Sequence, residues 1–197
     1  MDKQFFIFIG RSGSGKGTQA DLLKSLLEEK EATVKHITTG GGFRDFIKGD
    51  NYVAGCANKV NEVGGLQPEF LAVWNWSNIF INSLKENDSV ILDGAPRKVY
   101  EVQALHSAIK FLGYKNPIVV YVDVSETWAK EKLLSRGRDD DKNVEDIDKR
   151  LSWFETEVLP VIDVYMHDPR YKLIRVNGEQ SIDEVNKEIL TKLDMLV

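Results

Sequence analysis

The 197-residue sequence has few of the residues that form disulfides or structural metal sites. It contains one cysteine, Cys56, which excludes an internal disulfide and a zinc site built from several cysteines. With three histidines, a structural metal is not expected either. A lone cysteine is most often a small buried hydrophobic residue, and we expect Cys56 to be one.

Long hydrophobic segments are also absent. No apolar run approaches the roughly 20 residues that span a bilayer. The N-terminal MDKQFFIFIG has a charge before a short apolar run, but this run leads into a glycine loop rather than a small-residue cleavage site. We interpret it as a buried strand rather than a signal peptide, and expect a cytoplasmic protein with no membrane partner.

The chain has no excess of positive charge. Its net charge of −5 argues against a nucleic-acid polymer as partner, because such a partner requires a broad basic face. A small polyanion needs only a local basic pocket. The length suits one domain, residues 1–197, and we favour a monomer although nothing in the sequence specifies the oligomeric state.

Five short and almost continuously apolar segments predict strands buried on both faces. They are QFFIFI (4–9), TVKHI (33–37), SVILD (89–93), PIVVYVD (117–123) and YKLIRV (171–176). Apolar residues at helical spacing fill the intervening stretches, including residues 70–84, where we expect Trp74 and Trp76 to pack in the core. This alternation predicts a three-layer α/β fold, a five-stranded parallel sheet flanked by helices, with ligands at the carboxyl ends of the strands.

The glycine loop GRSGSGKGTQA, residues 10–20, joins the first predicted strand to a helical stretch. Its glycines let backbone N–H groups point around a phosphate, the helix adds its positive N-terminal end, and Lys16 adds a point charge. The loop satisfies most of G-x-x-x-x-G-K-[ST], but Gly17 follows the lysine and the hydroxyl arrives at Thr18. The context predicts a P-loop that binds a nucleotide.

Transfer of a phosphoryl group fits the sequence better than hydrolysis. Asp93 ends a predicted strand and is well placed to hold magnesium-bound water, but Gly94 follows it where many ATPases carry a glutamate that activates water. A GTPase needs the base-reading N-K-x-D, and the nearest candidate, NKVN at 58–61, lacks the aspartate.

Six ordered motifs resemble those of adenylate kinases, within the nucleoside monophosphate kinase family. The family's G-x-P-G-x-G-K-G-T, S-T-G-D-x-x-R, G-x-L-V-P and L-D-G-[FY]-P-R correspond to GRSGSGKGT, TTGGGFR, GGLQP and LDGAPR. Its short-lid pattern corresponds to RGRDDD with IDKRL, and its P-[VL]-I-x-x-Y to PVIDVY. The matches keep the family's order from residue 10 to residue 165, and G-K-G-T is the family's usual form of the loop.

The resemblance implies reversible, magnesium-dependent transfer of the terminal phosphoryl group of ATP to AMP, giving two ADP. It also implies a monophosphate-binding insertion at 38–67 and a short lid at 137–143, which close over the nucleotides and exclude water. The implied catalytic residues are Lys16, Arg97, Arg136, Arg138 and Arg150. The implied ATP site is Gly13, Ser14, Gly15, Lys16, Gly17, Thr18 and Arg136. The implied AMP site is Thr39, Gly40, Arg44, Leu66, Gln67, Gly94, Arg97 and Glu101. Magnesium is implied as the cofactor, held through water by Thr18 and Asp93.

Three substitutions depart from the family. Gly41 replaces the aspartate of S-T-G-D, Lys132 stands where short-lid relatives often have an arginine, and Glu101 replaces a glutamine that reads adenine. An ionised glutamate only accepts hydrogen bonds, so it suits adenine less well and tolerates a base with two donors, such as guanine. Two alternatives remain here: Gln103 reads the base instead, or Glu101 faces solvent.

Two other functions therefore stay open. One is a kinase for another monophosphate, namely GMP, CMP or UMP. The other is a nucleotide-binding regulator or weak ATPase without transfer activity. Asp140 and Asp141 have two interpretations as well, as groups that orient lid arginines or as solvated charges at a helix start.

Overall fold

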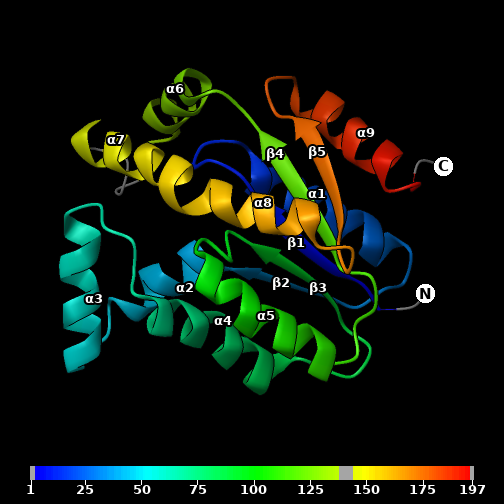
Figure 1. The fold of residues 1–197 in the computed structure, drawn as a ribbon, viewed down its shortest axis with the longest axis horizontal. Coiled ribbons are helices and arrows are strands. Elements are labelled where there is room, and N and C mark those ends of the chain that lie inside the picture. The colour runs from blue at the N-terminus through cyan, green and yellow to red at the C-terminus, as the bar shows by residue number, and fades with distance from the viewer. Residues whose placement is uncertain (1–2, 138–143, 196–197) are drawn as a thin grey trace.

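In the computed structural model, residues 3–137 and 144–195 are described. Five parallel strands form one sheet in the order β2-β3-β1-β4-β5 (Figure 1). The strands are β1 (Phe5–Ile9), β2 (Val34–Thr38), β3 (Ser89–Asp93), β4 (Ile118–Asp123) and β5 (Lys172–Asn177). The five predicted strands and the parallel sheet are confirmed.

Helices connect the strands and cover both faces of the sheet (Figure 1). They are α1 (Lys16–Glu29), α2 (Thr39–Phe46), α3 (Tyr52–Glu62), α4 (Glu69–Ser83), α5 (Val99–Phe111), α6 (Glu126–Arg136), α7 (Val144–Trp153), α8 (Leu159–His167) and α9 (Ile182–Lys192). A π-helical segment, η2 (Phe154–Val158), joins α7 to α8. Among the described residues, no helix is both long and apolar enough to cross a membrane.

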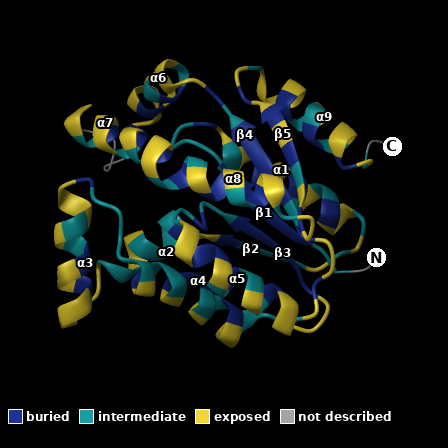
Figure 2. Cartoon of the chain, viewed as in Figure 1, coloured by how far each residue is buried: buried dark blue, intermediate teal, exposed yellow. Residues whose placement is uncertain are grey.

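The core lies in two layers because alternate side chains of a strand point to opposite faces. All five residues of β1 are buried. Phe6 and Phe8 pack with the apolar faces of α1 and α9, whereas Phe5 and Ile7 pack with those of α4, α5 and α8. Figure 2 shows this as dark blue strands between helices that are buried on one side only.

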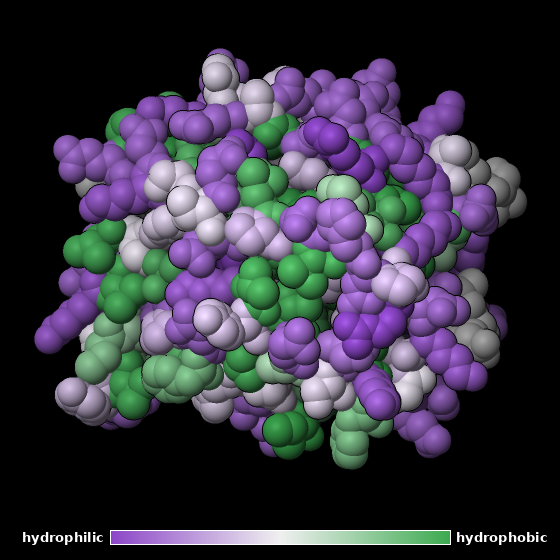
Figure 3. Space-filling view, viewed as in Figure 1, coloured by the Kyte–Doolittle hydropathy of each residue, from purple (hydrophilic) through white to green (hydrophobic). Residues whose placement is uncertain are grey.

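The apolar face predicted for residues 70–84 is partly wrong. Helix α4 buries Leu71, Trp76 and Phe80, but Phe70 and Ile81 are 67% and 82% exposed. Trp74 is also exposed, and its ring packs on Phe46 of α2 with centroids 4.9 Å apart. The helix carries more apolar residues than one face can hold, and Figure 3 shows hydrophobic side chains among hydrophilic ones over α4 and α5.

The expectation that Cys56 is buried is also wrong. Cys56 lies on α3 and is exposed. Helix α3 is at the edge of the molecule (Figure 1) and buries only Ala54 and Ala57, so the cysteine falls on its solvent side. An edge helix that packs through two alanines leaves most of its surface in water.

Candidate functional site

A cleft of about 1520 Å³ lies at the carboxyl ends of β1, β2 and β3. The register of the sheet places Asp93, the last residue of β3, opposite Phe8 of β1 and Thr38 of β2. Segments that follow three neighbouring strands therefore reach one space. The sequence-predicted site residues line this cleft, with one exception. Arg138 lies outside the described residues, as do Asp140, Asp141 and all of the predicted lid except Gly137.

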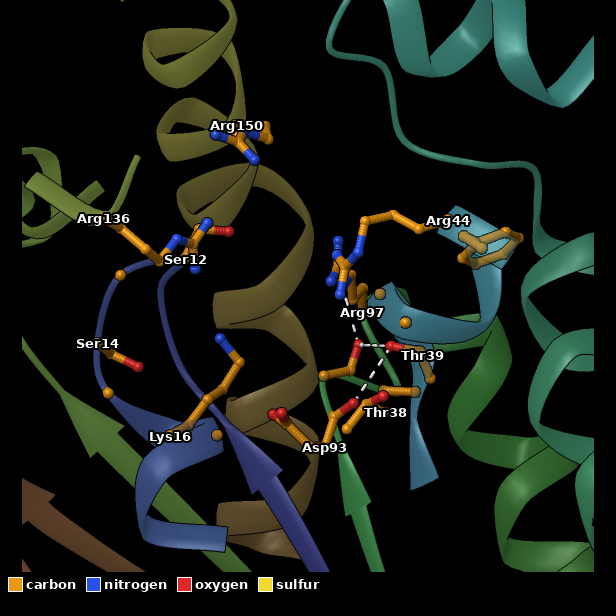
Figure 4. A pocket seen from close by; sticks show the side chains of 18 of the residues that line it. Ser12, Ser14, Lys16, Thr38, Thr39, Arg44, Asp93, Arg97, Arg136 and Arg150 are labelled. Carbon is orange, nitrogen blue, oxygen red and sulfur yellow. Dashed lines mark hydrogen bonds between the residues drawn. The ribbon is translucent and has the colours of Figure 1, made fainter. Parts of the chain in front are cut away.

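The P-loop curves around one end of the cleft (Figure 4). Gly13 has φ +85°, and a Cβ there would lie 2.5 Å from the carbonyl oxygen of Ala129 in α6, so only glycine fits. Gly15 has φ +84° and caps α1, and a Cβ there would meet no atom within 4 Å. The first turn of α1 has no acidic residue, which leaves the positive end of the helix free to attract an anion.

Two polar side chains of the loop face the same space. Ser14 is buried, and its Oγ has no hydrogen-bond partner among the described residues. The Lys16 Nζ donates to the carbonyl oxygen of Arg11 at 3.1 Å, which keeps the ammonium group folded back along the loop. Figure 4 shows the Lys16 side chain rising from the start of α1 between the two sides of the cleft. This arrangement suits a chain of phosphates that enters along the loop.

The structure explains why glycine follows the lysine. A Cβ at Gly17 would lie 3.3 Å from Oδ2 of Asp93, a contact tighter than most real Cβ atoms make. A side chain at residue 17 would therefore push the carboxylate away from the first turn of α1 by a few tenths of an ångström. Thr18, the next residue, is exposed toward the cleft and supplies the hydroxyl in its place.

Asp93 and Thr18 provide oxygen atoms that suit a hard divalent cation. The Oδ1 of Asp93 is buried and has no hydrogen-bond partner within residues 3–137 and 144–195. No group of three or more His, Cys, Asp or Glu residues that could hold a metal occurs among these residues. Magnesium commonly binds through one or two carboxylates together with water and substrate phosphates, so the donors present fit it.

The opposite side of the cleft is organised by the main-chain carbonyl of Gly94. The Oγ1 of Thr39 donates to this oxygen at 2.9 Å, and the Nε of Arg97 donates to it at 2.9 Å (Figure 4). Gly94 has φ +81°, and a Cβ there would lie 3.1 Å from Thr39 Oγ1 and 3.4 Å from Arg97 Nη2. One carbonyl therefore holds a hydroxyl from α2 and a guanidinium group from the segment before α5.

Arginines from several elements converge on the cleft. Arg44 comes from α2, Arg97 precedes α5, and Arg136 and Arg150 come from α6 and α7 (Figure 4). Burial lowers the pKa of Arg97, and the nearby charges of Arg150 and Arg44 lower it further, against the opposite effects of Glu101 and Asp93. Guanidinium groups stay protonated in proteins, so this end of an acidic chain is locally cationic. Several such groups around one space suit phosphate, which arginine binds through two parallel hydrogen bonds.

Glu101 lies beside these cations. It is 3% exposed and lines the cleft, whereas Gln103 on the same helix is exposed, so the solvent-facing alternative for Glu101 is wrong. Its Oε1 accepts hydrogen bonds from the backbone N–H groups of Arg97 at 3.3 Å and Lys98 at 3.2 Å. Burial raises the pKa of the Glu101 carboxyl, and these N–H groups and the two positive charges oppose the rise.

The comparisons with known proteins agree with this geometry. The adenylate kinase family model matches residues 8–169. The chain belongs to the adenylate kinase family. It is 34% identical to "Adenylate kinase 1" of a Nostoc species over 190 residues, which cover 95% of this chain and 97% of that protein. It is 34% identical to an adenylate kinase of Leptospira biflexa, over 95% of this chain and 98% of that one. It is 30% identical to adenylate kinase isoenzyme 1 of Caenorhabditis elegans, over 96% of this chain and 87% of that one. It is accordingly a phosphotransferase.

This member of the adenylate kinase family has residues in or behind the cleft that the sequence did not point to. Asn75 of α4 is buried, and its Nδ2 donates to the carbonyl oxygen of Thr39 at 2.9 Å, which fixes α2 against α4. Trp128 of α6 lines the cleft, and the ammonium group of Lys132 lies 4.6 Å from the centroid of its ring. Gly178 lines it as well, directly after β5. The available signal was position, because Trp128 and Gly178 both follow strand ends.

At Gly41, where the family has an aspartate, a neighbouring side chain fills the space beside the glycine. A Cβ at this residue would lie 2.5 Å from Oγ1 of Thr38. The threonine hydroxyl thus occupies the space in which a side chain at residue 41 would begin. Asp93 lies close to the start of α1, with its Oδ2 3.3 Å from the position of a Cβ at Gly17, and residue 41 adds no second carboxylate.

Proposed function

We propose that the enzyme reversibly transfers the terminal phosphoryl group of ATP to AMP, giving two ADP, with magnesium as its cofactor. The observation that carries this proposal is the convergence of Lys16 with arginines from four separate segments on one cleft, in a chain of net charge −5. A site for one nucleotide needs the P-loop and a few cations. A second cationic group on the far side of the cleft suits a second phosphate ester.

The donor nucleotide takes the P-loop side. Backbone N–H groups from Gly13 to Thr18 surround the ATP phosphates, with Lys16 as the mobile cation and Arg136 at the far side. Arg138 joins them from the short lid at 137–143. Support comes from the positive φ at Gly13 and Gly15 and from the start of α1 at Lys16, which together aim the loop's N–H groups inward.

The acceptor nucleotide takes the Gly94 side. Arg44 and Arg97 hold the phosphate of AMP, while Thr39, Gly40 and Gly94 shape the space beside it. Leu66, Gln67 and Glu101 border the base. The salt bridge between Lys98 Nζ and Glu69, 2.8 Å long, supports this assignment because it brings the segment after Gln67 next to Glu101.

Residues 38–67 act as the flap over this acceptor. Lys149 of α7 donates to the carbonyl oxygen of Val63 at 3.4 Å. A Cβ at Gly64 would lie 3.1 Å from the Cβ of Asp146, so the loop after α3 touches α7. The flap and the helix that carries Arg150 thus meet across the cleft, an arrangement that favours exclusion of water from the reacting groups.

Alignment and charge neutralisation carry the reaction. Phosphoryl transfer leaves little covalent work to the protein, so the enzyme holds donor and acceptor in line and balances the negative charge on the migrating group. Magnesium supplies further neutralisation of the phosphate oxygens when it is bound near Asp93 and Thr18. Gly94 follows Asp93 with no side chain that could activate water, which favours AMP as the acceptor. We place the reaction in the cytoplasm of the cell, with a monomer acting on ATP and AMP rather than on a nucleic acid or a membrane.

An acceptor panel tests the proposal. The enzyme is given ATP and magnesium with AMP, GMP, CMP or UMP in turn, and diphosphates and free phosphate are quantified by ion-exchange chromatography. We expect two ADP for each ATP consumed with AMP, and slow phosphate release without an acceptor. A faster reaction with another monophosphate would assign a different acceptor, and phosphate release unchanged by every acceptor would contradict transfer.

A further inference from the structure

Glu101 is a buried carboxyl group whose two oxygens have different surroundings. Oε1 accepts from two backbone N–H groups, those of Arg97 and Lys98. Oε2 has no hydrogen-bond partner in the described part of the chain, in a side chain that lines the cleft. Because a carbonyl-type oxygen accepts such N–H groups, a proton on this carboxyl would reside on Oε2. The group that faces the acceptor base is then a donor when protonated and an acceptor when ionised.

These two states match different bases. The edge of adenine that carries its amino group also presents N1, a ring nitrogen that accepts a hydrogen bond. A neutral Oε2–H donates to this nitrogen, whereas an ionised Oε2 faces its lone pair. Guanine presents N–H at the same ring position, so an ionised Oε2 accepts from it. One proton on Glu101 therefore changes which base the site fits, and an unpaired polar group left by the wrong base is costly.

We propose that Glu101 selects the acceptor base through its protonation state, so that AMP binds to the neutral carboxyl and takes up one proton when the free enzyme is ionised. This inference rests on the proposed function, because it assumes that AMP is the acceptor and that its base borders Glu101. No covalent step is involved. The proton comes from solvent and is returned when AMP leaves.

The groups around Glu101 set the pH at which this occurs. Burial, which raises its pKa, is the largest influence, and the positive charges of Arg97 and Lys98 lower it. Lys98 is paired with Glu69 of α4, which offsets part of its charge. From α8, the buried Tyr165 faces this region as a neutral phenol, since burial holds its pKa well above the usual range. The phosphate of AMP, bound to Arg97, would offset that positive charge and favour the protonated carboxyl further.

Calorimetric titration with AMP, at pH values from about 5.5 to 8.5 and in two buffers of different ionisation enthalpy, tests the inference. Glu101→Gln is the matched variant, because an amide keeps the acceptor oxygen for the backbone and offers a permanent donor to the base. The phosphate of AMP also titrates in this range, and the variant measures that contribution without the carboxyl group. The difference between them isolates the proton on residue 101.

For the native enzyme we expect AMP affinity to fall about tenfold for each pH unit above the pKa of Glu101, with up to one more proton taken up than in the variant. The variant should show no such fall beyond that of the AMP phosphate. Affinity for GMP relative to AMP should rise with pH in the native enzyme. Identical pH profiles and proton counts for the two proteins would overturn the inference.

A second probe does not depend on the folding of the variant. An AMP analogue with carbon in place of N1 offers no acceptor to Oε2, so its binding to the native enzyme should lack the additional proton. Uptake equal to that with AMP would also overturn the inference. The proposed function fails in a different way: the native enzyme would then form no ADP from AMP at any pH, whereas failure of the inference alone leaves that activity intact.

Discussion

Replacing Gly94 with alanine tests how the acceptor side of the cleft is built. Gly94 has φ +81°, where a residue with a Cβ costs about 1–2 kcal/mol. The new Cβ would also lie 3.1 Å from Thr39 Oγ1, so the hydroxyl has to shift by a few tenths of an ångström, and we expect its hydrogen bond to the Gly94 carbonyl to break. Loss of this hydrogen bond adds about 0.5–1.5 kcal/mol. We expect the free energy of unfolding to fall by about 1.5–3.5 kcal/mol in total.

The same change should weaken the binding of AMP more than the binding of ATP. Arg97 donates to the Gly94 carbonyl, so a shift of this peptide displaces the guanidinium group that holds the acceptor phosphate. A loss of about 0.5–1.5 kcal/mol in AMP binding corresponds to a rise of about twofold to twelvefold in the KM for AMP. The KM for ATP should stay within twofold, because the P-loop is not touched.

Gly113 provides the matched control. It has φ +76°, but a Cβ there would meet no atom within 4 Å, and it lies after α5 away from the cleft. Gly113→Ala should therefore lose only the backbone contribution, about 1–2 kcal/mol, with both KM values unchanged. Urea denaturation and steady-state kinetics of the two variants measure these quantities. If they lose equal stability and the KM for AMP does not change in Gly94→Ala, the carbonyl does not organise the acceptor site.

Three further changes have distinct expected results. Arg97→Ala should raise the KM for AMP or lower kcat at least tenfold, because charge-assisted hydrogen bonds contribute about 1.5–3 kcal/mol. ATP binding, measured by calorimetry, should change little. Arg170→Ala, outside the cleft, is the control, and an equal loss of affinity for AMP and ATP in Arg97→Ala would refute the role of Arg97. Gly17→Ser should raise the magnesium concentration needed for half-maximal activity, since its Cβ would lie 3.3 Å from Oδ2 of Asp93. An unchanged magnesium titration would show that the short distance between residue 17 and Asp93 does not matter for magnesium binding. Burial raises the pKa of Tyr114 to about 12. The phenol therefore stays protonated to a higher pH in the folded chain than in the unfolded chain. The free energy of unfolding should fall as pH rises from about 10 to 12. Tyr114→Phe should reduce this fall in urea denaturation series, and an equal fall in the variant would assign it to other groups.

Much of the fold follows from the sequence because its strands are unusually clear. Each strand is a short apolar run between turn residues, and burial on both faces in a parallel sheet requires that pattern. The helices are less clear. In α4 the apolar residues exceed one face, so spacing alone did not separate the buried Trp76 from the exposed Phe70. The expectation that Cys56 is buried is wrong for a related reason, because the burial of α3 depends on its place at the edge of the molecule.

The sequence predicts which residue types line the site, but it does not predict which of them contact one another. The spacing of the P-loop and the arginine motifs point to residues that line one cleft. The reasons for Gly17 and Gly94 lie in contacts with Asp93 and Thr39, which are far away along the chain, and one sequence shows no such pairing. Asn75 was missed in the same way, since its role depends on the packing of α2 on α4.

The most direct test of the account follows the phosphoryl group itself. The enzyme is mixed with AMP, magnesium and ATP that carries a label in its terminal phosphate, and the reaction is stopped within the first turnover. The amount of label is then measured in free phosphate and in each of the two phosphate groups of ADP. Transfer across a closed cleft predicts that the label appears in the terminal phosphate of the ADP formed from AMP, with almost none as free phosphate. Label released mainly as free phosphate in the presence of AMP would contradict the account.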